Sequence, residues 1–207
     1  MIPVKILSVQ YIPNADAGLC RALGIGQSSL ALITTDCDDA TYIALDDATK
    51  AADVTVSYGS SFYAGAATAP TPNAGEVMGC LAGATPGAVR SGMAAVTAAL
   101  ARIGFTDVGG IPCLAHTVSS CGSFLAKEAG VRQGSALAYL IAPPLESIVG
   151  LDAALKAADV KLCKLYPPPT QTNFGGGLLT GTQSACTAAC SAFLEAIRRI
   201  AATPVER

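Results

Sequence analysis

The spacing of apolar and polar residues predicts short strands that alternate with amphipathic helices. Strands are expected at residues 4–10, 30–34, 54–58 and 76–82, where apolar side chains alternate with polar ones or form short runs between turn-forming residues. In the helix expected after Pro86, five apolar residues step by four and three positions, so they share one face. They are Val89, Met93, Val96, Leu100 and Ile103. The alternation indicates a mixed α/β fold.

One stretch of the chain occurs twice. Residues 44–56 and 150–162 lie 106 positions apart and are identical at eight of thirteen aligned positions. Each stretch indicates a short helix that carries Lys and Asp, followed by a strand. The chain is therefore predicted to contain two copies of one α/β unit, with a first domain at residues 1–108 and a second at residues 109–207.

The second copy follows the order of the first. A strand to Val118, a helix near residues 122–129 and a strand at residues 137–142, matched to residues 30–36, keep the spacing of 106. The last helix, at about residues 183–202, has the same apolar steps as the helix after Pro86, but 97 positions later. The fall from 106 to 97 predicts a net loss of nine residues, most simply in the loop after the repeated strand.

Polar residues mark the starts of the shorter helices. Asn14 is placed to cap a helix that ends before Gly24, because glycine is common just after a helix. The helix of the repeated stretch is expected near residues 46–52, after an acidic turn at residues 35–39.

Two long segments interrupt the pattern at equivalent places. Residues 59–75 and 167–177 are rich in residues that break regular structure. Loops longer than about 12–15 residues in compact domains are usually functional or mobile. The run Gly175–Gly177 lacks the lysine of a phosphate-binding loop and is interpreted as a hinge.

The composition favours a protein that associates with itself. The chain is 51% hydrophobic and only 14% charged, which leaves few charges to cover the surface of a monomer. A net charge of -2 without a long basic run makes nucleic-acid binding improbable. No apolar run is long enough to cross a membrane, and the first residues indicate a strand, so we expect a cytosolic protein.

The eight cysteines form no C-x-x-C pair and are interpreted as reduced, mostly buried thiols. Cys186 and Cys190 are one helical turn apart and could share a metal ion. Their counterparts in the first copy are the apolar Val89 and Met93, so burial in the core is the better interpretation. Cys37 lies among carboxylates, which would raise its pKa, and a metal site there stays an alternative.

The single histidine, His116, has Ser119 and Ser120 nearby, but the sequence contains no nucleophile elbow to support a Ser-His-Asp site. A lone histidine on a strand is more typical of the core or of an interface.

Carboxylates gather at the ends of predicted strands. They are Asp36, Asp38, Asp39 and Glu76. Aspartates in turns commonly bond to their own backbone, which is one interpretation. If they line an opening instead, their field would favour cationic or polar solutes over anions. An enzyme or a small-molecule-binding protein that uses Asp38, Asp39 and Glu76 is the alternative, but no positioned nucleophile accompanies them, so we expect no catalytic residues.

Five strings of residues stand out by their order and spacing. They are residues 38–44 (DDATYIA), 58–67 (YGSSFYAGAA), 72–77 (PNAGEV), 142–146 (APPLE) and 179–186 (LTGTQSAC). Together with the two unequal loops, they resemble the tandem-domain shell proteins of bacterial microcompartments, of the ethanolamine-utilisation type.

The resemblance implies two tandem, circularly permuted microcompartment domains, each a small sheet flanked by helices. Three chains would form a flat pseudohexameric tile that contacts other shell proteins, without enzymatic activity. The loops at residues 60–73 and 167–177 would gate a central pore for metabolites or cofactors. The gating residues implied are Tyr63, Ala64, Gly65, Asn173, Phe174, Gly175 and Gly176.

The resemblance also implies a smaller opening within each subunit, where members of the family can bind ethanolamine. Its acidic positions match Asp38, Asp39 and Glu76, and its aromatic position matches Phe105. Neither long loop contains a cysteine that could hold an iron-sulfur cluster, so we expect neither a cofactor nor a metal ion. The expected partners are two further copies, other shell proteins and small polar metabolites, in the shell of a cytoplasmic microcompartment.

Overall fold

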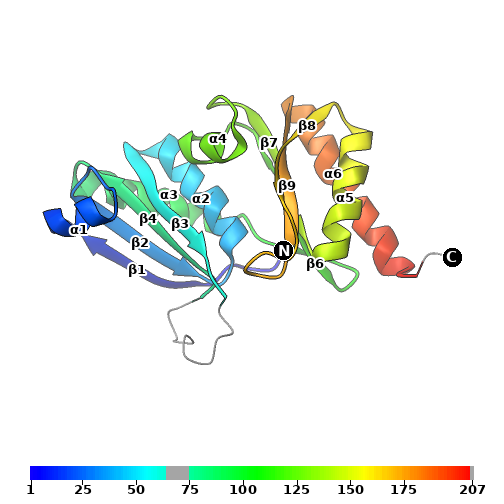
Figure 1. Cartoon of the computed structure of the whole chain (residues 1–207), viewed down its shortest axis with the longest axis horizontal. Helices are drawn as coiled ribbons and strands as arrows, with labels where there is room; N and C mark the ends of the chain where they lie inside the picture. The colour runs from blue at the N-terminus through cyan, green and yellow to red at the C-terminus, as the bar shows by residue number, and fades with distance from the viewer. Residues whose placement is uncertain (64–74, 206–207) are drawn as a thin grey trace. The chain divides into compact units, whose positions relative to one another are not determined.

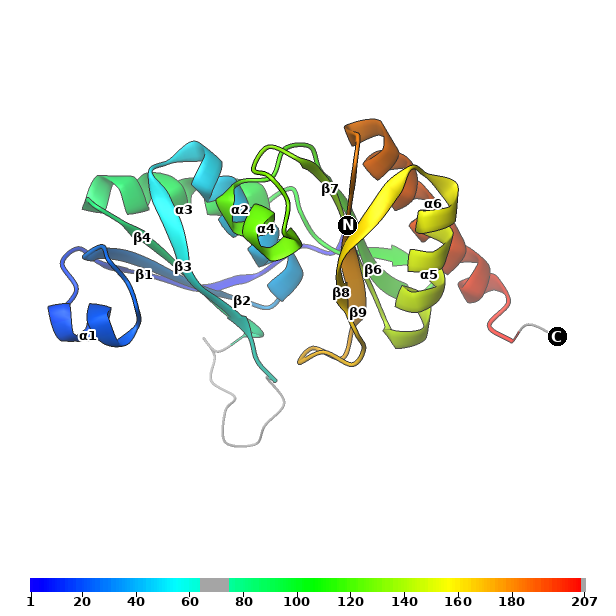
Figure 2. The same ribbon diagram turned by 45° about the horizontal axis from the view of Figure 1, so that its top comes forward.

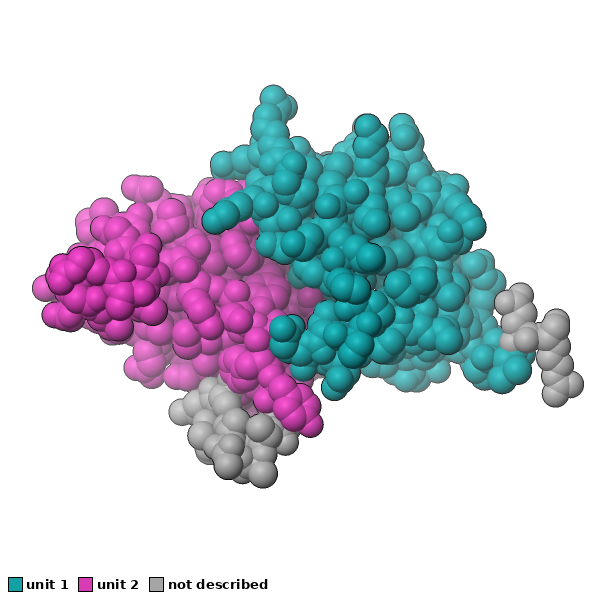
Figure 3. Space-filling view, in the orientation of Figure 1, with its two compact units in different colours: residues 1–2, 104–121, 126–207 teal, residues 3–103, 122–125 magenta. Residues whose placement is uncertain are grey.

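The computed structural model describes residues 1–63 and 75–205 (Figures 1 and 2). The chain forms two compact units, which Figure 3 shows in different colours. Unit 1 consists of Met1–Ile2, Gly104–Cys121 and Ala126–Arg207, and unit 2 of Pro3–Ile103 and Gly122–Leu125. Each unit is a mixed α/β structure, which confirms the predicted fold class.

Unit 2 contains an antiparallel sheet with the strand order β1-β2-β4-β3. Its strands are β1 (Ile6–Ile12), β2 (Ser29–Thr35), β3 (Val54–Ser61) and β4 (Val77–Gly83). Its helices are α1 (Ala17–Ala22), α2 (Asp38–Ala51) and α3 (Pro86–Leu100). Helices α2 and α3 pack against each other and against the sheet, as Figure 1 shows, because each has one apolar face.

Unit 1 repeats this plan with one additional strand, in the order β5-β6-β7-β9-β8. Its strands are β5 (Thr106–Val108), β6 (Ile111–Val118), β7 (Ala136–Ala142), β8 (Val160–Tyr166) and β9 (Gly175–Gly181). Helices α5 (Pro144–Ala157) and α6 (Gln183–Ala202) lie side by side on its sheet (Figure 2). Of helix α4 (Ser123–Ala129), the first three residues belong to unit 2.

The internal repeat extends to an irregularity in the sheets. Helices α2 and α5 begin and end 106 residues apart. The β3–β4 register shifts between Val56 and Tyr58, and the β8–β9 register shifts between Leu162 and Lys164, at the equivalent positions. Two copies of one supersecondary unit are therefore present, as the repeated stretch predicted.

The predicted spacing between the copies is wrong by one residue in two places. Strands β4 and β9 start 98 residues apart, while the helix caps Thr85 and Thr182 are 97 apart. The second copy is therefore eight residues shorter than the first before β9, and one residue shorter in the turn between β9 and α6. Leu30 pairs with Ala82 and Leu137 with Thr180, so β2 and β7 are related by 107 rather than 106.

Two predicted helix starts are also wrong. Helix α2 begins at Asp38 and not near residue 46, because acidic side chains in a first turn interact favourably with the helix dipole. Helix α1 is capped by Asp16 and not by Asn14: the Asp16 carboxylate accepts hydrogen bonds from the N–H groups of Gly18 and Leu19. The end of α1 at Gly24, with a φ of 68°, is confirmed.

The prediction that Gly175–Gly177 forms part of a loop is wrong. These glycines are buried in β9 and pair with Ala142, Ile141 and Leu140 on β7. A Cβ atom at Gly176 would collide with the carbonyl oxygen of Leu140, so this close approach of two strands requires glycine. The loop between β8 and β9 is accordingly limited to residues 167–174.

The core of unit 1 lies between its sheet and helices α5 and α6, and it contains Cys186 and Cys190 beside Phe193. Both thiols are buried and free, which confirms their structural interpretation. None of the helices within the described residues is long and apolar enough to span a membrane.

Candidate functional site

The candidate site is a group of carboxylates where β2 leads into α2. Strand β2 ends at Thr35, and Asp38 and Asp39 form the first turn of α2, with both side chains nearly buried. The Oδ1 atom of Asp36, between strand and helix, accepts a hydrogen bond from the backbone N–H of Lys5 at 2.7 Å. The local backbone thus holds three carboxylates within four consecutive residues.

A chain of hydrogen bonds connects Asp38 to β3. Its Oδ1 accepts the N–H of Asp39 at 2.8 Å, and its Oδ2 accepts the hydroxyl hydrogen of Ser61 at 2.7 Å. The hydroxyl oxygens of Ser61 and Tyr42 lie 2.6 Å apart. Because Ser61 has one hydrogen and gives it to Asp38, Tyr42 donates to Ser61. Asp38 therefore bonds both its own helix start and a neighbouring strand.

Backbone contacts fix the position of Glu76. Its N–H donates to the carbonyl of Thr35 at 2.8 Å, and its carbonyl accepts the N–H of Phe62 at 3.0 Å. The preceding Gly75 has a φ of 63°, and a Cβ atom there would collide with the Thr35 carbonyl. Glycine is thus required for the turn that brings Glu76 to the end of β2.

The charges of this cluster influence one another. Burial raises the pKa of Glu76, and the charges of Asp38 and Asp36 raise it further. Burial also raises the pKa of the Cys37 thiol, with smaller contributions in the same direction from Asp39 and Asp38. The direction for Cys37 is as predicted, but burial is the larger cause.

Burial raises the pKa of the Tyr42 phenol to about 12, so Tyr42 stays a hydrogen-bond donor at neutral pH. The cluster therefore offers anionic acceptors, because the single hydroxyl hydrogen of Tyr42 is already given to Ser61. Such a set can attract a cation or hold a hydrogen-bonding solute. Among residues 1–63 and 75–205, no three His, Cys, Asp or Glu side chains form a group that could hold a metal ion.

Phe105 and Phe174, predicted to serve different openings, contact each other in unit 1. Their ring centroids lie 5.2 Å apart in an edge-to-face arrangement. The carbonyl of Phe105 accepts the N–H of Ile2. The Phe174 carbonyl accepts the N–H of Thr170, and Asn173, with a φ of 66°, donates its N–H to the Thr170 carbonyl. Phe174 thus ends a closed turn.

The other predicted gating residues have different surroundings. Tyr63 is exposed beyond the end of β3. Ala64 and Gly65 lie outside the described residues. Gly175 and Gly176 are buried in β9.

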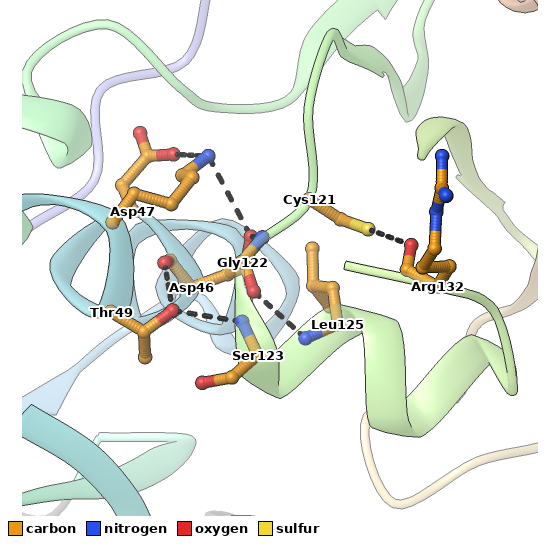
Figure 4. Close-up of polar contacts among 9 residues, drawn as sticks. Asp46, Asp47, Thr49, Cys121, Gly122, Ser123, Leu125 and Arg132 are labelled. Carbon is orange, nitrogen blue, oxygen red and sulfur yellow. Dashed lines mark hydrogen bonds and ion pairs between the residues drawn. The ribbon is translucent and has the colours of Figure 1, made fainter. Parts of the chain in front are cut away.

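Asp46 is a residue whose role the sequence did not reveal. It is fully buried, and its two carboxylate oxygens accept the N–H groups of Gly122 and Leu125 at 2.7 and 2.8 Å (Figure 4). The Thr49 hydroxyl accepts the N–H of Ser123 at 3.1 Å. Asp46 therefore serves as the cap that α4 lacks in its own sequence. The sequence did contain one signal: Gly122, which has no side chain to cap the helix, stands directly before α4.

The chain is similar to known shell proteins over its whole length. Residues 29–110 match the family model of the BMC domain. The chain is 52% identical to the bacterial microcompartment shell protein EutL of Clostridium perfringens, over 99% of this chain and 97% of that protein. It is 46% identical to the shell protein EutL of Salmonella typhimurium, over 100% of this chain and 97% of that protein.

The fold agrees with these relatives. The crystal structure of the ethanolamine utilization protein EutL from Leptotrichia buccalis matches with a TM-score of 0.95 and 50% identity, over 100% of this chain and 98% of that one. Both relatives above are named as microcompartment shell proteins, so the role of the chain is structural. The chain belongs to the EutL family of bacterial microcompartment shell proteins.

Proposed function

We propose that three copies of the chain form a flat pseudohexameric tile in the shell of a cytoplasmic microcompartment. Each chain contributes two microcompartment domains, residues 1–108 and 109–207, so that six domains surround a central pore. The match to the BMC domain model ends at residue 110, two residues beyond this boundary, whereas β5 (Thr106–Val108) already pairs with β6 of unit 1. Tiles contact other shell proteins at their edges, as the family membership implies.

The observation that carries the transport proposal is the cluster of Asp38, Asp39 and Glu76. These carboxylates come from two separate segments, and the charge of Asp38 contributes to the raised pKa of Glu76. In the proposal these three carboxylates line a small opening in each subunit. Their field favours small polar or cationic solutes such as protonated ethanolamine and disfavours anions.

In the proposed central pore, two unequal segments form the gate. Tyr63, Ala64 and Gly65 come from the first, and Asn173 and Phe174 from the second. Gly175 and Gly176 belong to β9, so the second segment ends at Phe174. Movement of that segment would separate Phe174 from Phe105, so the ring contact marks one state of the gate.

Mass and binding measurements test this proposal together. Analytical ultracentrifugation should give three times the chain mass of 20.7 kDa, and electron microscopy at high concentration should show flat sheets. Isothermal titration calorimetry should detect binding of ethanolamine, added as its hydrochloride, and no binding of acetate. Asp38→Asn should weaken ethanolamine binding at least about tenfold, because it removes a charge-assisted hydrogen bond.

The matched control is Asp159→Asn, which removes an exposed carboxylate of unit 1 and should leave binding unchanged. A monomer that forms no sheets would rule out the tile. A trimer that binds acetate as well as ethanolamine would rule out the acidic opening and leave the tile intact.

A further inference from the structure

Within unit 2, the first turn of α4 lies on a surface formed by α2 and β3. Besides the hydrogen bonds to Asp46 and Thr49, the ring of Phe124 contacts the ring of Tyr42, with centroids 6.1 Å apart. A Cβ atom at Gly59 would lie 3.5 Å from the Phe124 ring, so this glycine of β3 borders the same ring. The first turn of α4 covers this surface, and Asp46 is completely buried.

The repeat provides an equivalent surface on α5 and β8, 106 residues later, which we call the α5 face. It consists of Ile148, Val149, Leu155 and Leu165, which are 48%, 43%, 36% and 43% exposed. The positions equivalent to Ile148 and Leu165 are Tyr42 and Gly59, which border Phe124 in unit 2. Four apolar side chains with this much exposure on two adjacent elements are typical of an interaction surface.

The helix equivalent to α4 is α1, and its own contact surface is exposed. Leu19 and Leu125 are the same residue type at equivalent positions, 106 apart. Leu125 is 1% exposed, whereas Leu19 is 45% exposed. Leu23, one turn further along the chain, is also exposed. The chain therefore presents both halves of a contact that it makes once internally.

The shapes of the two exposed halves are complementary. In unit 2, the large Phe124 of α4 lies beside the small Gly59 of β3. At the equivalent positions the small residue is on the helix and the large one on the strand: Gly18 of α1 corresponds to Phe124, and Leu165 of β8 corresponds to Gly59. A helix with glycine at this point leaves room for the leucine, so the total volume at the contact is preserved.

The hydrogen bonds that Asp46 accepts from the start of α4 have no required counterpart on the α5 face. Helix α1 has its own cap, Asp16, whereas α4 depends on Asp46. Asp152, the counterpart of Asp46, is 60% exposed and forms an ion pair with Lys156 at 2.6 Å. Asp152 is four residues after Ile148 and three before Leu155, so this exposed pair lies on the same side of α5 as the apolar residues.

We propose that α1 of one chain docks on the α5 face of a second copy of the chain, with Leu19 as its apolar anchor. The inference deepens the proposed tile and rests on it, since it names the contact that joins one chain to the next. The contact joins two different surfaces, so it is head-to-tail, and such contacts close into rings when the rotation between copies allows.

Two single variants test the docking by mass in solution. Leu19→Glu and Ile148→Glu should each raise the dissociation constant of the trimer at least about tenfold, because each places a charge in a buried apolar contact. Each variant retains one intact half. A mixture of the two should therefore form a one-to-one dimer and nothing larger. The double variant Leu19→Lys with Ile148→Glu should restore the trimer.

Val205→Glu is the matched control, because it introduces the same charge at an exposed apolar residue outside the α5 face. Circular dichroism checks that each variant folds. If a Glu variant does not fold, the single variants Leu19→Ser and Ile148→Ser take the place of the two Glu variants. A wild-type monomer would overturn the tile and the docking together. Folded Glu variants that remain trimeric would overturn the docking and leave the tile intact.

Discussion

Asp46 and Asp152 are the same residue type at equivalent places in the repeat, yet their surroundings differ completely. Asp46 is buried and accepts two backbone N–H groups of the α4 start, with Lys50 at 3.6 Å. Asp152 is largely exposed and forms an i,i+4 ion pair with Lys156. An exposed pair of this kind stabilises a protein by less than about 1 kcal/mol.

Replacement of Asp46 by alanine should destabilise the protein by about 2–4 kcal/mol, because two buried N–H groups lose their acceptor. Asp47→Ala is the control, since Asp47 is partly exposed and contacts the same Lys50 at 2.5 Å. It should cost less than about 0.5 kcal/mol. Urea unfolding followed by circular dichroism measures both, and equal losses would contradict the capping role.

Glu76 gives a prediction about pH. Burial first, and then Asp38 and Asp36, raise its pKa in the folded state above that in the unfolded chain. The ionised form is therefore disfavoured in the fold, and this cost is fully present above the folded pKa. Glu76→Gln should raise the unfolding temperature at pH 7, and the gain should disappear as the pH falls below the unfolded pKa of about 4.3.

The exposed Glu195, paired with Arg198 on α6, provides the control for this pH series. Glu195→Gln should leave the unfolding temperature nearly unchanged between pH 4 and pH 7. A gain from Glu76→Gln that persists at low pH would show that shape, and not charge, causes it.

At the scale of elements, the two helix pairs fill their cores by different means. Gly150 of α5 lies against Phe193 of α6, where a Cβ atom would come within 2.6 Å of the ring. The equivalent pair in unit 2 is Ala44 on α2 and Val96 on α3, both buried. A glycine opposite a large ring and an alanine opposite a smaller side chain are two solutions for one helix spacing.

Gly150→Ala should therefore destabilise unit 1 by about 1–3 kcal/mol through overpacking against Phe193. The double variant Gly150→Ala with Phe193→Val reproduces the pair of unit 2 and should recover part of this loss. A double-mutant cycle from urea unfolding gives the coupling. Strict additivity of the two changes would contradict direct contact between them.

The apolar stripes of α3 and α6 were predictable because a helical period is a local property of the sequence. The start of α2 was not, since Asp38 and Asp39 are equally typical of turns and of first helical turns. Strand β9 was missed because glycine carries no strand signal. Its place depends on the close approach of Leu140 in a neighbouring strand.

The candidate site was predictable only in part. Asp38, Asp39 and Glu76 could be named from the chain, but the bond from Ser61 to Asp38 connects residues 23 positions apart. The contacts of Asp46 reach 76 and 79 residues along the chain. Such pairings are fixed by tertiary packing, and no local pattern encodes them. The roles of Tyr63, Phe174 and the other gating residues stay predictions.

At the scale of the whole molecule, the low charge content makes apolar contacts the main force for assembly. The α5 face contains four apolar residues, and the exposed ion pair between Asp152 and Lys156 lies on the same side of α5. Raising the ionic strength from about 0.1 M to 1 M shortens the Debye length from about 10 Å to 3 Å and weakens only charge-based contacts. In analytical ultracentrifugation the trimer should therefore persist in 1 M salt, and dissociation into monomers would indicate that charge pairs hold the chains together.

In the proposed ring, Phe124 meets Gly59 at one kind of junction and Gly18 meets Leu165 at the other, and this exchange of sizes has a consequence for symmetry. Six first copies alone would place Gly18 over Gly59 and leave a void. Six second copies alone would force Phe124 onto Leu165 and collide. The duplicated chain thus cannot return to a sixfold ring without repacking both kinds of junction. In the proposed tile, shape at the contacts between copies would therefore require first and second copies to alternate around the ring.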